Sequence, residues 1–219
     1  MGQIAALFDM DLTLLDRSSG LLYMRYMLRT GRVRRRDAAR AMWWGLLSRV
    51  GLLDMQNLIP RMVVDVTGDS AEEARTASNE WFADDVAPHI TERGRQRVEK
   101  HKAEGHVVAI VSGSTQFAVG PMAEHLGIPG QYVCTRLESR DGHLTGQVVP
   151  PVCYGPGKVV WAERFADEHG VDLSASYFYT DSITDLPLLE RVAHPVAVNP
   201  DPRLRRLAQK RGWPVETFF

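Results

Sequence analysis

The chain has 219 residues, of which 44% are hydrophobic and 24% are charged. This length suits one domain, or one domain with a modest insertion, and the composition excludes a wholly disordered chain. The formal net charge is −1, so the sequence indicates no nucleic-acid partner. This total hides how the charges are distributed along the chain, which is uneven.

The cysteines and the N-terminal residues bear on the cellular compartment in which the protein is found. Two cysteines, Cys134 and Cys153, are too few for a disulfide framework, and their spacing matches no zinc motif, so we expect inert thiols. Residues 1–4 contain no basic segment typical of a secretory signal. No uncharged apolar run reaches the ~18 residues that would span a bilayer. We therefore predict a cytoplasmic protein.

The first element in chain order is a short apolar segment, residues 4–8. Its unbroken hydrophobic run is typical of a strand buried on both faces of a parallel sheet. The stretch from residue 17 to about residue 88 then has helical patterning without strand alternation, which predicts an inserted helical subdomain. The predicted division is a core of residues 1–15 and 89–219 and a helical insertion of residues 16–88.

Strands and helices alternate beyond residue 90. The predicted strands are residues 106–111, 177–180 and 196–198, and the predicted helices are residues 91–104, 115–126, 157–169, 186–192 and 201–211. Residues 132–149 contain Asp141-Gly142 between short apolar runs, which predicts a β-hairpin. The alternation predicts an α/β fold with a doubly wound, Rossmann-like parallel sheet that carries helices on both faces.

Polar residues stand at the ends of three predicted strands. They are Asp9 and Asp11 after the first strand, Ser112 and Gly113 at the end of the second, and Asp181 and Asp185 after the third. In open α/β sheets, ligands bind outside the carboxyl ends of the strands, so we expect these residues to converge. Lys158 opens a helix between the second and third of these strands and can reach the same place.

This set of residues suits phosphate chemistry. Carboxylates at one rim repel one another unless a cation lies among them, and oxygen ligands without histidine or cysteine favour Mg²⁺. One carboxylate can attack phosphorus, and a second one two residues along the strand points to the same side and can transfer protons. The seven histidines form no metal-like cluster in the sequence, and we expect none of them to be catalytic.

Four motifs, in this order, resemble those of the haloacid dehalogenase (HAD) superfamily. They are Asp9-Met10-Asp11-Leu12-Thr13, the strand that ends at Ser112, Lys158, and Asp181-Ser182-Ile183-Thr184-Asp185. The resemblance covers essentially the whole chain and is greatest to subfamily IB, which is phosphoserine-phosphatase-like and histidinol-phosphatase-like. It implies a HAD-like Rossmannoid core with an α-helical C1-type cap, and a Mg²⁺-dependent phosphatase that works through an aspartyl-phosphate.

The resemblance also implies a role for each motif residue. Asp9 would be the nucleophile, and Asp11 would be the general acid/base and would lend its backbone carbonyl to Mg²⁺. The implied catalytic residues are Asp9, Asp11 and Lys158, the implied phosphate ligands are Ser112, Gly113 and Lys158, the implied metal ligands are Asp9, Asp11 and Asp181, and the implied supporting residues are Thr13 and Asp185.

Departures from the phosphoserine phosphatases bear on the substrate. Those enzymes carry a glutamate just after the first motif that recognises the substrate amine, and Ser18 occupies that position here. They commonly have an asparagine where this chain has Thr184. Both departures weigh against phosphoserine without excluding it, since Asp16 can still pair with an amine.

The C-terminal part of the chain suggests another substrate. Residues 185–189, 199–204 and 212–214 look like a bacterial group that includes histidinol-phosphate phosphatases. This similarity makes histidinol phosphate a candidate substrate beside phosphoserine. We expect residues 199–204 and 212–214 to lie away from the site, so they indicate ancestry rather than chemistry.

The charges of the insertion are segregated. Residues 17–61 hold ten arginines against two acids, a balance of +8, whereas residues 62–88 hold one arginine against seven acids, a balance of −6. Six arginines crowd the junction of two predicted helices: Arg29, Arg32, Arg34, Arg35, Arg36 and Arg40. They form either a solvated face, an attractant for anionic substrates, or, with Trp43 and Trp44, a basic helix on anionic lipid.

The main hypothesis is a phosphoric monoester hydrolase acting on a small phosphorylated metabolite. A phosphotransferase or mutase shares the same aspartyl-phosphate and stays open. A phosphatase for a lipid-linked phosphomonoester, or a protein that binds a membrane surface through the arginine-rich segment, stays open as well. The sequence does not determine the oligomeric state.

Overall fold

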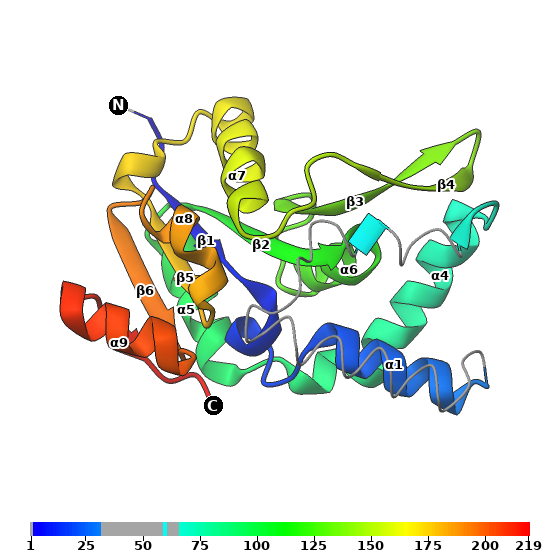
Figure 1. Ribbon diagram of the computed structural model, residues 1–219, viewed down its shortest axis with the longest axis horizontal. Coiled ribbons are helices and arrows are strands. Elements are labelled where there is room, and N and C mark those ends of the chain that lie inside the picture. The colour runs from blue at the N-terminus through cyan, green and yellow to red at the C-terminus, as the bar shows by residue number, and fades with distance from the viewer. Residues whose placement is uncertain (1, 32–58, 61–65) are drawn as a thin grey trace.

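The computed structural model describes residues 2–31, 59–60 and 66–219. A central twisted sheet carries helices on both faces, and further helices lie beyond one end of its strands (Figure 1). Most of the arginine-rich segment is outside the described residues, including Arg32, Arg34, Arg35, Arg36, Arg40, Trp43 and Trp44. Within the described ranges, no helix is long and apolar enough to cross a membrane.

The sheet has seven strands in the order β4-β3-β2-β1-β5-β6-β7. The strands are β1 (Ala5–Phe8), β2 (Val107–Thr115), β3 (Tyr132–Arg140), β4 (His143–Val149), β5 (Tyr177–Thr180), β6 (His194–Val198) and β7 (Val215–Glu216). All neighbouring strands are parallel except β3 and β4, which pair antiparallel. The predicted α/β fold is therefore confirmed.

The predicted hairpin is confirmed as the β3–β4 pair. Its two turn residues, Asp141 and Gly142, have φ angles of 51° and 80°. Tight two-residue turns that match the twist of the strands need positive φ at both positions, and Asp-Gly supplies it at little steric cost. This local rule explains why the hairpin could be predicted from two residues.

Helices cover both faces of the sheet. The helices on the faces are α5 (Glu92–Ala103), α6 (Gln116–His125), α7 (Pro156–His169), α8 (Leu186–Leu189) and α9 (Pro202–Arg211). Helices α1 (Ser19–Arg29) and α4 (Ala71–Trp81) belong to the insertion, beyond the ends of the strands (Figure 1). Successive β1 residues face opposite sides, as strand geometry requires. Phe8 packs in the cluster that includes residues of α5 and α6, and Leu7 packs in the cluster of α7, α8 and α9.

Three elements differ from the prediction. Strand β2 continues to Thr115, since its end pairs with β3 across an irregularity between Ser112 and Thr115. Helix α8 ends at Leu189 because the chain must turn before β6 begins at His194. The sequence does not predict β7, because two residues are too few for an alternation to be recognised.

Two linkers join the core to the inserted segment, and they pair with each other. Leu15 and Ile90 form an antiparallel bridge, and the Asp16 N–H donates to the His89 carbonyl over 3.0 Å. The Asp16 carboxylate also lies 2.8 Å from His89 Nδ1. The pairing falls at the predicted domain boundaries. The boundaries themselves stay a prediction, because much of the insertion is outside the described residues.

The β3–β4 hairpin extends from the sheet toward α4 (Figure 1). Ser70, which caps α4, forms an antiparallel bridge with His143. The Gly68 N–H donates to the Leu144 carbonyl over 2.8 Å. Residues 66–88 of the insertion are thus anchored to the core through backbone hydrogen bonds to the hairpin.

Both cysteines are buried and free. Burial raises the pKa of Cys134 to about 12 and raises that of Cys153 still further. Because the thiolate is the reactive form, neither residue supplies a nucleophile or a soft metal ligand at neutral pH. The geometry therefore agrees with the expectation of inert thiols.

Candidate active site

The carboxyl ends of β2, β1 and β5 lie side by side, since these strands are neighbours in the sheet. Asp9 directly follows β1, Ser112 lies in the last part of β2, and Asp181 directly follows β5. All three are buried. The predicted convergence of residues from three distant parts of the sequence is therefore present in the structure.

Lys158 joins two of the predicted carboxylates. Its Nζ donates to Asp9 Oδ1 over 2.6 Å and to Asp185 Oδ2 over 2.7 Å. Thr180, the last residue of β5, donates its hydroxyl to the same Asp185 oxygen over 2.7 Å. Lys158 is only 3% exposed, so these bonds are screened little by solvent. The bridge fixes the orientation of the Asp9 carboxylate.

A glycine lets the start of α7 come close enough for this bridge. A Cβ placed on Gly157 would collide with the carbonyl oxygen of Val152. Only glycine therefore allows the first turn of α7 to pack against the preceding segment, and this packing brings Lys158 to the carboxylates. The sequence contains the glycine but does not show why it is needed.

The electrostatics of the site favour a bound cation. Burial raises the pKa of Asp9 to about 7, with Lys158 opposing the shift. Burial lowers the pKa of Lys158, but Asp185 and Asp9 outweigh it and raise that pKa above its usual value. Within the described residues, the carboxyls of Asp9, Asp11 and Asp185 all interact with Lys158, and Asp181 directly follows the neighbouring strand β5. A divalent cation would offset this excess of negative charge.

Asp11 is held by the first helix of the insertion. Its Oδ1 accepts the backbone N–H of Ser19 over 2.8 Å, and its Oδ2 accepts the Ser19 hydroxyl over 3.0 Å. Ser19 Oγ also lies 2.7 Å from Ser114 Oγ, near the end of β2. Burial raises the pKa of Asp11, and the hydrogen bonds from Ser19 oppose this rise. Both carboxylate oxygens of Asp11 are therefore engaged by Ser19.

Ser112 and Gly113 lie in the last part of β2, the strand that pairs with β1. Ser112 is buried, and its Oγ accepts the N–H of Ser114 over 3.2 Å. A Cβ on Gly113 would lie 3.4 Å from the ring of Tyr154, which therefore packs against this glycine. Tyr154 also hydrogen-bonds to Thr184. The sequence reasoning missed Ser19, Ser114 and Tyr154, because no motif marks them.

Residues near the C-terminus support the site loops, which corrects one expectation. Residues 199–204 were expected to lie away from the site. Instead, Asn199 Nδ2 donates to the Leu12 carbonyl over 3.3 Å, and the Asp201 N–H donates to the Asp181 carbonyl over 2.8 Å. Leu12 has a φ of 59°, a conformation that leucine rarely adopts, so this support matters. The end of β6 runs beside β5, which brings these residues to the site.

Thr13, in the segment that follows β1, is fully buried. Among the described residues, its hydroxyl has no hydrogen-bond partner. Burying a hydroxyl without a hydrogen-bond partner costs free energy of folding. We therefore expect this hydroxyl to gain a partner when the site binds its ligands. The role of Thr13 in supporting the loop stays a prediction.

The expectation that the histidines form no metal-like cluster is wrong. His101, Glu104 and His106 place ligand atoms within 4.8 Å of one another. A glycine turn at Gly105 folds the chain back and brings the two imidazoles together. The cluster lies at the amino-terminal end of β2, whereas the aspartates lie at the carboxyl ends of the strands.

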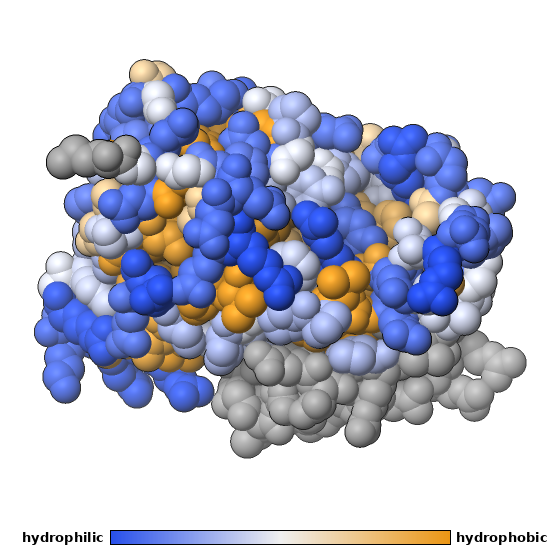
Figure 2. Space-filling view, turned by 90° about the horizontal axis from the view of Figure 1, so that it is seen from above, coloured by the Kyte–Doolittle hydropathy of each residue, from blue (hydrophilic) through white to orange (hydrophobic). Residues whose placement is uncertain are grey.

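Of the six clustered arginines, only Arg29 falls in the described residues. It donates two hydrogen bonds to Asp85, at 2.9 and 2.7 Å, and so links α1 to residues 82–86 within the insertion. On the face seen in Figure 2, hydrophobic residues show in separate groups between hydrophilic ones. The guanidinium of Arg29 is therefore paired within the insertion. Lipid contact stays a prediction.

The sequence model of the haloacid dehalogenase-like hydrolases matches residues 6–190. This range is most of the chain and contains all four motifs. This chain belongs to the haloacid dehalogenase-like hydrolase family. The predicted family is therefore confirmed.

Similar proteins in this family are named phosphatases. A Mycobacterium tuberculosis protein named as a probable phosphatase is 36% identical over 98% of this chain and 75% of its own length. The histidinol-phosphatase of Neisseria meningitidis is 31% identical over 97% of this chain and 98% of its own length. The prediction that this HAD-family chain is a phosphoric monoester hydrolase is confirmed.

Solved structures share the fold. A Bordetella pertussis protein of unknown function is 33% identical, with a TM-score of 0.87 over all of both chains. A substrate-bound phosphoserine phosphatase is 21% identical, with a TM-score of 0.70 over all of this chain and 94% of its own. At that identity, the second likeness shows the fold alone. The roles of the individual site residues stay predictions.

Proposed function

We propose that this HAD-family phosphatase is Mg²⁺-dependent and works through an aspartyl-phosphate on Asp9. The observation that carries the proposal is the Lys158 bridge, which engages Asp9 Oδ1 and so directs Oδ2 as the nucleophile. A carboxylate held this way can form a covalent intermediate that divides a hard hydrolysis into two easier steps.

The site residues fit Mg²⁺. The carboxylates of Asp9 and Asp181 and the backbone carbonyl of Asp11 are hard oxygen donors, which Mg²⁺ prefers. The imbalance of charge at the site supports the same conclusion. When bound, Mg²⁺ would neutralise part of the charge on the phosphate and help to position it.

In the first step, Asp9 Oδ2 attacks phosphorus while the bond from phosphorus to the ester oxygen breaks. Asp11 donates its proton to the leaving alkoxide. In the second step, Asp11 takes a proton from water, the water oxygen attacks phosphorus, and the bond to Asp9 breaks. Ser112 and Lys158 hold the phosphoryl oxygens in both steps. Inorganic phosphate and a free carboxylate of Asp9 result.

We propose histidinol phosphate as the substrate. The protein named histidinol-phosphatase aligns with this chain over nearly the full length of both. Phosphoserine is less favoured, because Ser18 stands where the phosphoserine phosphatases have their amine-binding glutamate. The Asp16 carboxylate, the alternative amine partner, is engaged by His89.

The substrate prediction is tested by measuring phosphate release from a panel of phosphomonoesters. With Mg²⁺, we expect kcat/KM for histidinol phosphate to exceed that for phosphoserine by at least about tenfold, and chelation of Mg²⁺ to stop both reactions. Equal values, or a preference for phosphoserine or lysophosphatidate, would contradict the proposed substrate. A requirement for an added hydroxyl acceptor before any phosphate leaves its donor would indicate a phosphotransferase instead.

A second prediction concerns the proton donor. Ser19→Ala removes one hydrogen bond that favours the charged form of Asp11, so the pKa of Asp11 should rise. The loss of activity at high pH, where Asp11 loses its proton, should then shift to higher pH for an alkyl phosphate such as histidinol phosphate. An aryl phosphate is the control, because its leaving group needs no proton. An unchanged pH profile for both esters would count against this role of Asp11.

A further inference from the structure

A cluster of two histidines and one glutamate lies where α5 turns into β2, away from the aspartates. His101 is in the last turn of α5, Glu104 caps the helix, and His106 directly precedes β2. His101 is only 3% exposed, whereas Glu104 is exposed and His106 is half-buried. The cluster is therefore open to solvent on one side.

Backbone geometry brings the two imidazoles together. Gly105 has a φ of 75°, and the His106 N–H donates to the His101 carbonyl over 3.0 Å while the Gly105 N–H donates to the Lys102 carbonyl, also over 3.0 Å. These bonds are those of a Schellman helix end, which places the first residue after the glycine beside the residue five positions earlier. That pair is commonly hydrophobic. Here both members are histidines.

The three side chains present a triangle of ligand atoms. His101 Nδ1 and His106 Nδ1 are 2.8 Å apart, and each is 3.6 Å from Glu104 Oε2. A point equidistant from these atoms lies about 2.0 Å from each, which is the usual length of zinc bonds to imidazole nitrogen and carboxylate oxygen. The 3.6 Å separations are close to the spacing of two ligands on a tetrahedral zinc ion, whereas the two imidazole nitrogens, now joined by a hydrogen bond, have to move apart from 2.8 Å to about 3.3 Å.

We propose that His101, Glu104 and His106 form a second metal site, specific for Zn²⁺ rather than Mg²⁺. Imidazole nitrogen is a good ligand for zinc and a poor one for magnesium. Three protein ligands leave a fourth position on the solvent side, which a water molecule can take. The site is separate from the proposed Mg²⁺ site, and it goes beyond the proposed phosphatase reaction.

The neighbours of the cluster hold His101 in a ligating orientation. Its Nε2 lies 2.8 Å from the hydroxyl of Tyr179 in β5. Metal-bound histidines usually have their other ring nitrogen fixed by such a partner. Zinc needs the lone pairs of both Nδ1 atoms. His101 therefore has to carry its proton on Nε2, and this N–H can donate a hydrogen bond to Tyr179 Oη. Tyr177 packs against both imidazole rings, with centroids 4.8 and 5.7 Å away.

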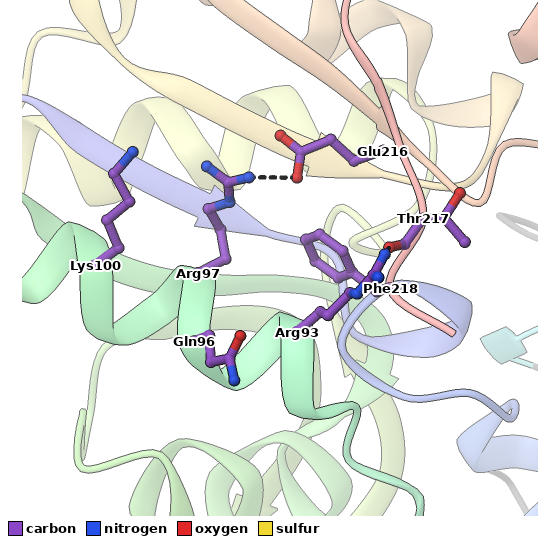
Figure 3. A pocket seen from close by; sticks show the side chains of 7 residues that line it. All are labelled: Arg93, Gln96, Arg97, Lys100, Glu216, Thr217 and Phe218. Atoms are coloured by element: carbon purple, nitrogen blue, oxygen red, sulfur yellow. Dashed lines mark hydrogen bonds and ion pairs between the residues drawn. The ribbon is translucent and has the colours of Figure 1, made fainter.

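Two cations of α5 lie next to the cluster, Arg97, which pairs with Glu216, and Lys100, which is near Glu104 itself. In the pocket of Figure 3, Arg97 extends from α5 to Glu216 near the C-terminus, with a 2.6 Å contact. Lys100 is 3.7 Å from the Glu104 carboxylate, a long contact between exposed groups that a metal can displace at little cost. Neither cation blocks the triangle of ligand atoms.

The test is equilibrium dialysis of the full chain against Zn²⁺ in the presence of millimolar Mg²⁺. We expect His106→Gln and Glu104→Gln each to bind one Zn²⁺ fewer per chain than the unmodified protein, or to bind it more than about 100-fold more weakly. Zinc at the aspartates is unaffected by these changes, so the difference reports on this site. His143→Gln, at an exposed histidine of β4, is the matched control and should bind as the unmodified protein does.

Two further readouts separate ligation from a structural role. Zn²⁺ should raise the Tm of the unmodified chain and of His143→Gln but not that of His106→Gln, while phosphatase activity in Mg²⁺ stays unchanged in all three. Tyr179→Phe should weaken zinc binding by about 10–100-fold without removing it. Equal zinc stoichiometry and affinity in the unmodified chain and both ligand variants would overturn the proposal, and the histidines would then be a hydrogen-bonded pair only.

Discussion

Asp9→Asn should lower phosphatase activity by more than about 10³-fold while the fold stays intact, because the amide cannot attack phosphorus. The substitution conserves shape, and Lys158 keeps its 2.7 Å contact with Asp185, so the buried ammonium group is not left without a partner. Phosphate release by the purified variant, with circular dichroism to verify folding, measures the effect.

The matched control is Asp16→Asn, the same chemical change at a half-buried carboxylate in the linker. It removes the contact with His89 but touches no proposed reacting group, so its activity should stay within a few-fold of the unmodified enzyme. With the unmodified enzyme, acid quenching during turnover should trap phosphate on the protein, and Asp9→Asn should trap none. Near-normal turnover by Asp9→Asn would refute the aspartyl-phosphate mechanism.

Lys158→Met should reduce both stability and activity. It leaves the buried carboxylates of Asp9 and Asp185 facing each other without a counter-charge, which should cost about 3–5 kcal/mol in the free energy of unfolding. Loss of a positive group that stabilises the transferring phosphoryl should lower kcat by at least about 10²-fold. Urea unfolding at neutral pH and steady-state kinetics measure the two effects.

Two comparisons make this result specific. Lys102→Met, at a partly exposed lysine of α5 that pairs with Glu99, should change stability by less than about 1 kcal/mol. Lys158→Met combined with Asp185→Asn should recover part of the lost stability, since one unpaired carboxylate is removed, but should recover no activity. The deficit of Lys158→Met should also shrink as the pH falls, because protonation neutralises the unpaired carboxylates. A loss of stability in Lys158→Met that neither Asp185→Asn nor a lower pH reduces would contradict the charge argument.

The sequence alone predicted a parallel sheet with helices on both faces and the polar residues that follow three of its strands. Short apolar runs, helix-ending glycines and the Asp141-Gly142 turn act over a few residues, so their effect on structure is visible locally. The carboxyl ends of parallel strands share one edge, and this rule places Asp9 and Asp181 together without knowledge of any contact. The family's motifs could be found because each one is a single residue or a short segment that follows a recognisable strand or opens a helix.

Only the tertiary structure decided which partners those residues have. Lys158 reaches Asp9 across 149 positions of the chain, and Asn199 reaches the loop at Leu12 across 187. No periodicity or spacing encodes such pairs, since they depend on how helices pack onto the sheet. The pairing of His101 with His106 is closer in sequence, but it depends on a left-handed glycine at position 105 and a Schellman helix end, which became apparent only from the backbone.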